Sequence, residues 1–316
     1  MEIRERSTRR EFLQDIGQAT GAAALASSAL HSVYAAEAAR RPDLVVTHFK
    51  PHQGEDPKVL VKKAVELLGG MKRFVSKGDI VVVKPNIGWD RLPRQAANTN
   101  PDAVVALIEM ALEAGAKEVK VFDNPVNAAN AQNIYERSGI AEAAKKAGAT
   151  VKIPDERFFK EMDIKGESLK RWPVYTEAVE CDCLINVPIA KQHSMARLTM
   201  ALKNHMGIIG GERGKWHPPL HVWLAEFAAF MKPNVKLTVL DAYRILVRNG
   251  PTGGAQKDVE MARKCVAGVD QIAVDAYGAS FFKLKPTDLG YLVKAKELGA
   301  GEIDLSKLTI QEVEVS

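Results

Sequence analysis

The sequence predicts an α/β protein with a mostly parallel sheet, helices on both faces and two lobes around a cleft. Short apolar runs alternate with longer segments of helical periodicity, as in successive β-α-β units. Residues 80–83 and 183–187 are nearly continuous apolar runs, which is typical of parallel strands that are covered on both faces. Polar residues follow both runs closely, and open α/β sheets bind ligands beyond the carboxyl ends of their strands.

The elements can be assigned in order from periodicity and from helix start and stop signals. Strands are expected at residues 44–47, 80–83, 118–122, 150–153, 183–187, 235–240, 266–269 and 308–315. Helices are expected at residues 58–68, 101–114, 130–137, 141–146, 217–230, 271–284 and 289–298. Asn100 can cap the helix that begins at Pro101, and Gly115 can end it. Residues 154–180 are less regular, and the alternation at 174–176 suggests an antiparallel edge element.

Two segments near the expected cleft have no single assignment. Residues 194–205 suit a helix capped by Ser194 or an alternating strand, and Thr199 and Lys203 share a face in both cases. The glycine-rich residues 207–215 lack the spacing of a phosphate-binding loop. We expect them to form a flexible loop that can close over a ligand.

The first 35 residues resemble a twin-arginine export signal, and residues 36–316 are expected to form the α/β domain. Arg9 and Arg10 lie in the run STRREFL, ahead of an Ala- and Gly-rich stretch with small residues near Ala35. The resemblance implies the twin-arginine translocase as a partner and a periplasmic or otherwise extracytoplasmic location. Because Gln18 and His31 interrupt a weakly apolar run, a stable membrane anchor is not expected.

The net charge and the cysteine count limit the classes of function that are expected. The formal net charge is +5 without a basic stripe, so nucleic-acid binding is not expected. The three cysteines, Cys181, Cys183 and Cys265, are too few for a disulfide framework or for the four ligands of a 4Fe–4S cluster. We therefore expect buried thiols and no self-contained cluster.

Candidate site residues lie near the ends of predicted elements, where a parallel sheet would bring them together. The predicted catalytic residues are His193, Lys191, Lys203 and Asp241. The predicted ligand- or cofactor-binding residues are Lys84, Asn86, Asn100, Asn186 and Asn204.

These residue types suit an enzyme that acts on a small anionic compound. Lysines would hold a carboxylate or phosphate, His193 would move a proton, and an aspartate would orient His193. The structural alternative is a solvated rim of lysines with one packed histidine, and for Asn100 it is a simple helix cap. The functional alternative is a periplasmic module that binds a small molecule or a metal without turnover.

The cofactor is left open, with a metal ion as one candidate. The candidate metal ligands are His193, Asp123 and Asp241. Cys181 and Cys183 lie at the amino end of the apolar strand, whereas the candidate ligands gather at the carboxyl ends of strands, which argues against thiolate ligands for the same ion. His217 and His221 have i, i+4 spacing, but the prolines between them favour capping or packing.

Over roughly residues 44–290 the chain resembles the family catalogued as domain of unknown function 362. The motifs that carry the resemblance are Lys84-Pro85-Asn86, Thr99-Asn100-Pro101, Gly115-Ala116 with the strand into Asp123, Asn186-Val187-Pro188 with Lys191 and His193, and Leu202-Lys203-Asn204 with Gly207. Members of this family are often described as iron–sulfur-associated, and many carry a ferredoxin-like cysteine run. This chain lacks that run, so the cluster is not carried over. A more distant likeness to lactate racemase-type proteins concerns the fold alone.

Overall fold

The computed structural model describes residues 41–51 and 56–316. The predicted twin-arginine signal, residues 1–35, lies outside the described residues. Pro42–Ser316 form a single compact unit, so the expected two lobes do not separate. Among the described residues, no helix has both the length and the apolar character needed to cross a membrane.

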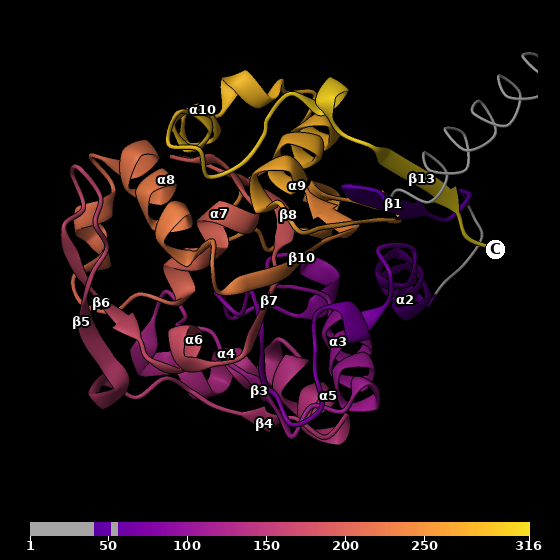
Figure 1. Ribbon diagram of the computed structural model, residues 1–316, viewed down its shortest axis with the longest axis horizontal. Coiled ribbons are helices and arrows are strands. Elements are labelled where there is room, and N and C mark those ends of the chain that lie inside the picture. The colour runs from indigo at the N-terminus through magenta and orange to yellow at the C-terminus, as the bar shows by residue number, and fades with distance from the viewer. Residues whose placement is uncertain (1–40, 52–55) are drawn as a thin grey trace, which may run out of the picture. The chain divides into compact units, whose positions relative to one another are not determined.

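A mixed sheet of eleven strands runs through the described part of the chain (Figure 1). Its main path is β13 (Ile310–Glu314), β1 (Leu44–His48), β12 (Lys264–Gly268), β10 (Val235–Leu246), β7 (Cys183–Val187), β2 (Ile80–Pro85), β3 (Glu118–Val121) and β4 (Thr150–Val151). Neighbours on this path are parallel, except that β12 runs antiparallel to both β1 and β10. The predicted mostly parallel α/β fold is therefore confirmed.

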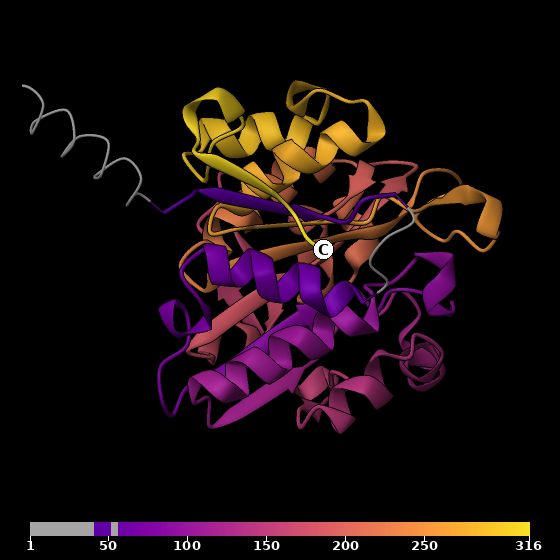
Figure 2. The ribbon, with the colours of Figure 1, turned by 90° about the vertical axis from the view of Figure 1, so that its right-hand side faces the viewer.

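Helices cover both faces of the sheet (Figure 2). One face carries α2 (Pro57–Leu67), α3 (Pro101–Ala114), α4 (Ala131–Arg137) and α5 (Ile140–Lys146). The other carries α7 (Ala201–Asn204), α8 (Leu220–Met231), α9 (Gln271–Gly278) and α10 (Gly290–Glu297). Because side chains alternate along a strand, Val81 and Val83 of β2 enter the first core and Val82 enters the second.

The predicted boundaries of α3 are confirmed, and their causes are visible. Asn100 Oδ1 accepts a hydrogen bond from Asp102 N at 3.2 Å, and Pro101 occupies the first turn. Gly115 ends the helix with a φ of 107°, a left-handed conformation that favours glycine. The irregular segment before β7 contains the predicted antiparallel element as a separate hairpin of β5 (Phe159–Asp163) and β6 (Arg171–Tyr175), followed by α6 (Glu177–Glu180).

Pro188 interrupts the central strand without ending the extended chain. β7 stops at Val187, and β8 (Ile189–His193) follows and pairs with the second half of β10. Lys191 and His193, which follow the predicted strand 183–187, lie on this further strand, which was not predicted. β8 also pairs with the antiparallel β9 (Arg197–Thr199), and β10 pairs with the short β11 (Val259–Glu260).

The structure decides two other local expectations. The segment 194–205 contains both of the structures considered for it, because β9 is followed by the short helix α7. β10 continues to Leu246, so Asp241 lies within the strand and not at its end. β10 extends past Asp241 because its second half pairs with β8 and β11.

Candidate functional site

A small cavity of about 70 Å³ lies beyond the carboxyl ends of β2 and β3, beside the hairpin of β8 and β9. Its polar lining includes Asn86, Asp123, Lys191, His193, Lys203 and Arg213. Five of these six are predicted site residues, and Arg213 is not. The strand periodicity explains part of the grouping, because Lys191 and His193 are alternate residues of β8. Thr199 is paired with Lys191 across the hairpin and also lines the cavity.

A buried ion pair forms the base of the site. Lys84 Nζ lies 2.6 Å from Asp123 Oδ1, and the two side chains are 0% and 2% exposed. Lys84 Nζ also donates to Pro85 O at 2.9 Å and to Asn204 Oδ1 at 3.0 Å, while Asp123 Oδ2 accepts from Ile87 N at 2.6 Å. Burial lowers the pKa of Lys84, and the charge of Asp123 opposes that shift. The pair therefore meets the condition for burying charge, which is opposite charge plus hydrogen bonds to the remaining polar atoms.

Asn204 links the segments around the site through hydrogen bonds of its side-chain amide. Its Oδ1 accepts from Asn86 Nδ2 at 3.1 Å, and its Nδ2 donates to Lys84 O at 3.2 Å and to Asn186 Oδ1 at 2.8 Å. Asn186 Nδ2 in turn donates to Ala201 O at 3.1 Å. Asn186 and Asn204 are thus fully engaged beneath the cavity, whereas Asn86 lines it.

Lys191 is buried, and its ammonium group is positioned by two acceptors. Its Nζ donates to Asn86 Oδ1 at 2.9 Å and to Ala97 O at 2.5 Å. An ammonium group has three donors, so one remains for a ligand. Burial lowers the pKa of Lys191 to about 7, with Asp123 opposing the shift and the charges of Lys203 and Lys84 adding to it.

Lys203 differs because the described residues offer its Nζ no hydrogen bond or ion pair. The side chain is half-buried, and burial with the nearby charges of Arg213 and Lys84 lowers its pKa to about 8. The Thr199 hydroxyl is buried and likewise has no partner within the described part of the chain. An unsatisfied buried polar group costs about 1–3 kcal/mol, so the Thr199 hydroxyl favours a polar ligand. The Lys203 amino group, free of partners in the described residues, lies at the same cavity.

His193 is oriented by backbone amides, and the expected orienting aspartate is absent from its described partners. Nδ1 accepts from Met195 N at 3.1 Å and from Ala196 N at 3.2 Å in the turn after β8. A ring nitrogen that accepts hydrogen bonds carries no proton, so the proton of the neutral ring lies on Nε2. Burial, aided by Lys203 and Lys191, lowers the pKa of His193 to about 3. The geometry therefore presents His193 to the cavity as a hydrogen-bond donor through Nε2, and its role in moving a proton stays a prediction.

Asp241 and Asn100 are paired with each other and do not line the cavity, contrary to their predicted place at the site. Asp241 Oδ2 accepts from Asn100 N at 2.8 Å, and Oδ1 accepts from Tyr243 N at 3.1 Å. Burial raises the pKa of Asp241, and these amide hydrogen bonds oppose the shift. Their visible role is to tie the start of α3 to the middle of β10.

The expected metal set of His193, Asp123 and Asp241 does not assemble. In the described ranges no three His, Cys, Asp or Glu side chains are grouped to hold a metal ion. Each expected ligand instead has the amide or ammonium partners given above. Cys181 and Cys183 are free thiols outside the cavity lining, and burial raises the pKa of each to about 12.

Arg213 and Gly207 come from the glycine-rich segment that was expected to be a flexible loop. Arg213 donates to the carbonyl oxygens of Asn124 at 2.8 Å, Met206 at 3.3 Å and Pro125. A Cβ atom at Gly207 would lie 1.6 Å from Asp123 Oδ1, so only glycine permits this close approach. Thr199 could have been identified as a site residue from the sequence, because it shares a face with Lys203 in both structures considered for that segment. No local pattern indicated where the Arg213 side chain would lie.

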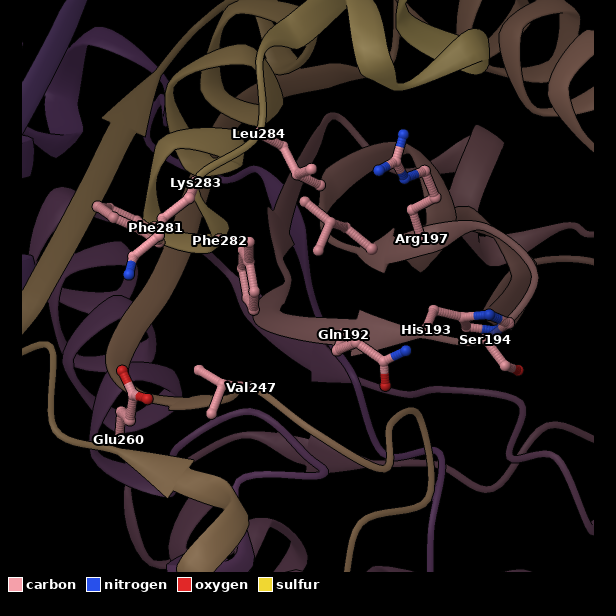
Figure 3. Close-up of a pocket in the computed structure, with 11 residues that line it drawn as sticks. Gln192, His193, Ser194, Arg197, Val247, Glu260, Phe281, Phe282, Lys283 and Leu284 are labelled. Carbon is pink, nitrogen blue, oxygen red and sulfur yellow. The ribbon is translucent and has the colours of Figure 1, made fainter.

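A larger cavity of about 500 Å³ adjoins the β8–β9 hairpin and shares His193 with the small one (Figure 3). Gln192 and Leu198 line this larger cavity, whereas their strand neighbours Lys191 and Thr199 line the small one. Because side chains alternate along a strand, the two cavities lie on opposite faces of the hairpin. Phe282 and Gln192 both line this larger cavity, as Figure 3 shows.

Comparisons with known proteins give a family without an assigned activity. A protein described as thylakoid-associated, from Synechocystis sp., is 26% identical over 246 residues, covering 76% of this chain and 74% of its own length. A solved structure from Thermotoga maritima shares 12% identity and covers 73% of this chain, with a TM-score of 0.47. The lactate racemase apoprotein of Thermoanaerobacterium thermosaccharolyticum shares 13% identity and covers 76% of this chain, with a TM-score of 0.43. This chain spans 60% and 57% of those two structures. The family model described as "Domain of unknown function (DUF362)" matches residues 81–280, more than half of the chain, and the protein therefore belongs to that family.

Proposed function

We propose that this protein is an exported enzyme that acts on a small anionic compound in the cavity lined by Lys191, Lys203 and Arg213. The observation that carries the proposal is that Lys203 Nζ and Thr199 Oγ1 line the cavity without any partner among the described residues. Both groups can donate hydrogen bonds to a ligand. A ligand that accepts hydrogen bonds would therefore satisfy them.

The charge balance favours an anion over a neutral acceptor. Asp123 is the only carboxylate among the lining residues, and its charge is already matched by Lys84. The positive charges of Lys191, Lys203 and Arg213 are therefore left in excess around the cavity. Each cation is shielded from water by burial, which strengthens its attraction for an anion.

The cavity volume limits the size of the anionic group. One water molecule needs about 10–15 Å³ of such space, so a cavity of about 70 Å³ has room for on the order of five of them. Pockets for drug-sized ligands are typically about 300–1,000 Å³. A carboxylate or phosphate group with few further atoms is the ligand that this volume supports.

The side chains differ in the chemistry that they can supply. Lys203 can gain or lose a proton near neutral pH, because its pKa is about 8 and it has no partner holding the proton. His193 Nε2–H would donate a hydrogen bond to the bound anion, and Lys191 would supply charge. This arrangement supports turnover with Lys203 as the reactive group and His193 as an electrophilic donor.

Export is the second part of the proposal, and it rests on the sequence of residues 1–35. Arg9 and Arg10 followed by an Ala- and Gly-rich stretch support recognition by the twin-arginine translocase. The enzyme would then act outside the cytoplasm after folding inside the cell.

The anion site is tested by calorimetric titration of the protein with acetate and with phosphate. We expect Lys203→Met to weaken binding by at least about tenfold, since a buried charged hydrogen bond is worth about 1.5–3 kcal/mol. Lys215→Met is the matched control, because Lys215 is an exposed lysine paired with Glu212 and absent from the cavity lining. Equal binding by wild type and Lys203→Met, or no binding of either anion by the wild type, would contradict the proposal.

A further inference from the structure

The three lysines at the site differ in how their amino groups are engaged. Lys84 is held by Asp123 and Asn204, and Lys191 is held by Asn86 and Ala97. Lys203 alone among these three has no hydrogen-bond or ion-pair partner in the described residues. Its amino group is thus free to attack a bound molecule without first breaking a contact.

We infer that Lys203 is a nucleophile that forms an imine with a small carboxylic acid carrying a carbonyl group, such as a 2-oxo acid. This inference rests on the proposed anion site and names its substrate class. Lys191 and Arg213 would hold the carboxylate, which brings the neighbouring carbonyl carbon within reach of Lys203.

The step needs only the amine and the carbonyl compound. The lone pair of the neutral Lys203 amine attacks the carbonyl carbon, and a carbon–nitrogen bond forms as the carbonyl π bond breaks. The two amine hydrogens leave with the carbonyl oxygen as one water molecule, which produces the imine. His193 Nε2–H can donate to the carbonyl oxygen while negative charge develops on it.

Two features of the surroundings support attack by Lys203. Desolvation and neighbouring cations activate a lysine by favouring its neutral form, and both act on Lys203. The buried Thr199 hydroxyl, unpartnered within the described ranges, supplies a donor for a ligand oxygen at the same cavity.

The geometry also favours a small substrate. Lys203 lines the 70 Å³ cavity and does not line the larger cavity of Figure 3. The reacting carbon and its carboxylate must therefore share the smaller space. A three-carbon oxo acid such as pyruvate is a suitable probe, and acetone is a control that keeps the carbonyl group and lacks the carboxylate.

The test is reductive trapping on the full chain, with cyanoborohydride and pyruvate, followed by peptide mapping by mass spectrometry. We expect the reduced pyruvate adduct on Lys203 at a level at least about tenfold above that on any exposed lysine, and no comparable adduct with acetone. Lys203→Arg, which keeps the positive charge, should abolish the specific label. Lys203→Met provides a second variant if the arginine does not fit, and Lys215→Arg should label as wild type does.

The outcomes separate this inference from the proposed function. Binding of acetate or phosphate without a pyruvate adduct on Lys203 would overturn the imine and leave the anion site standing. The imine would equally be overturned if the adduct were spread over exposed lysines, or if Lys203→Arg were labelled to the same level as the wild type. Absence of both anion binding and labelling would contradict the anion site itself.

Discussion

At the scale of single residues, the chemistry of a lysine at this site depends on what its amino group contacts. Lys84 serves structure, since its charge is matched by Asp123 at 2.6 Å. Lys191 is positioned by Asn86 and Ala97 but keeps one donor. Lys203 has no such contacts in the described residues and so remains available to a ligand.

The Thr199 hydroxyl gives a sharp test, because it has no partner to lose in the free protein. We expect Thr199→Val to leave the free energy of unfolding unchanged or to raise it by up to about 3 kcal/mol, because an unsatisfied buried hydroxyl is removed, and to weaken acetate binding about five- to tenfold. Calorimetry and denaturant titration measure the two quantities. Thr238→Val is the matched control, since Thr238 Oγ1 is also buried and unpartnered in the described part of the chain but lies outside the cavity lining. Equal acetate affinity in the two variants would contradict the role of Thr199.

Anion binding should depend on pH through the two cavity lysines. Their pKa values, about 7 for Lys191 and about 8 for Lys203, lie below those of ordinary lysines, so both lose protons in the free protein as pH rises. A bound anion favours the protonated forms. Acetate affinity should therefore fall by on the order of tenfold or more between pH 6 and pH 9.

The variant Lys203→Arg assigns the two transitions in that profile. Arginine does not titrate in this range, so the inflection near pH 8 should disappear and the one near pH 7 should remain. His193 should add no inflection near 6.5, because burial lowers its pKa to about 3. An affinity that is constant from pH 6 to pH 9 would show that these lysines do not contact the anion.

At the scale of elements, the turn after α7 is fitted against the buried ion pair. A Cβ atom at Gly207 would meet Asp123 Oδ1 at 1.6 Å and Lys84 Nζ at 2.7 Å, so this segment must shift to accept a side chain. The same segment connects Lys203 to Arg213. Its backbone position therefore influences both cations of the cavity.

We expect Gly207→Ala to lower the free energy of unfolding by about 1–3 kcal/mol and to weaken acetate binding strongly. Gly214→Ala is the matched control in the same glycine-rich segment, since a Cβ atom there would meet nothing within 4 Å. Denaturant titration and calorimetry of both variants make the comparison. Two variants of equal stability and affinity would show that the close approach at Gly207 has no such role.

Local pattern predicted the elements well because the signals for them are short-range. The apolar run of β2, the cap and proline at the start of α3, and Gly115 at its end each act within a few residues. The end of β10 was missed because the strand continues only by pairing with β8 and β11, which are distant in sequence.

The hydrogen-bond partners of the site residues were harder to predict, because they depend on contacts between segments that are distant in the sequence. Asp241 contacts Asn100 across 141 residues, and that contact removes both from the cavity. Lys191, His193 and Lys203 line the same cavity, but the backbone amides that orient His193 depend on the conformation of the turn after β8. The position of Arg213 depends on carbonyl groups from another loop.

At the scale of the whole molecule, export is tested by a charge-conserving change in the leader. Arg9→Lys with Arg10→Lys should leave the protein in the cytoplasm with its leader attached, because the twin-arginine translocase requires the arginine pair. Arg4→Lys with Arg6→Lys is the control with the same number of changes outside the pair. Cell fractionation with mass analysis of the N-terminus measures the result. Normal appearance of the Arg9, Arg10 variant outside the cytoplasm would contradict this route.

The central claim is that the cavity among Lys191, Thr199 and Lys203 holds a small anion. The most direct measurement is a crystal structure of the protein grown with pyruvate, refined without a ligand until the density is clear. We predict density for the carboxylate within hydrogen-bonding distance of Lys191 Nζ, Arg213 and Thr199 Oγ1, with the carbonyl carbon beside or bonded to Lys203 Nζ. Ordered water alone in this cavity at a saturating concentration of pyruvate would contradict the claim.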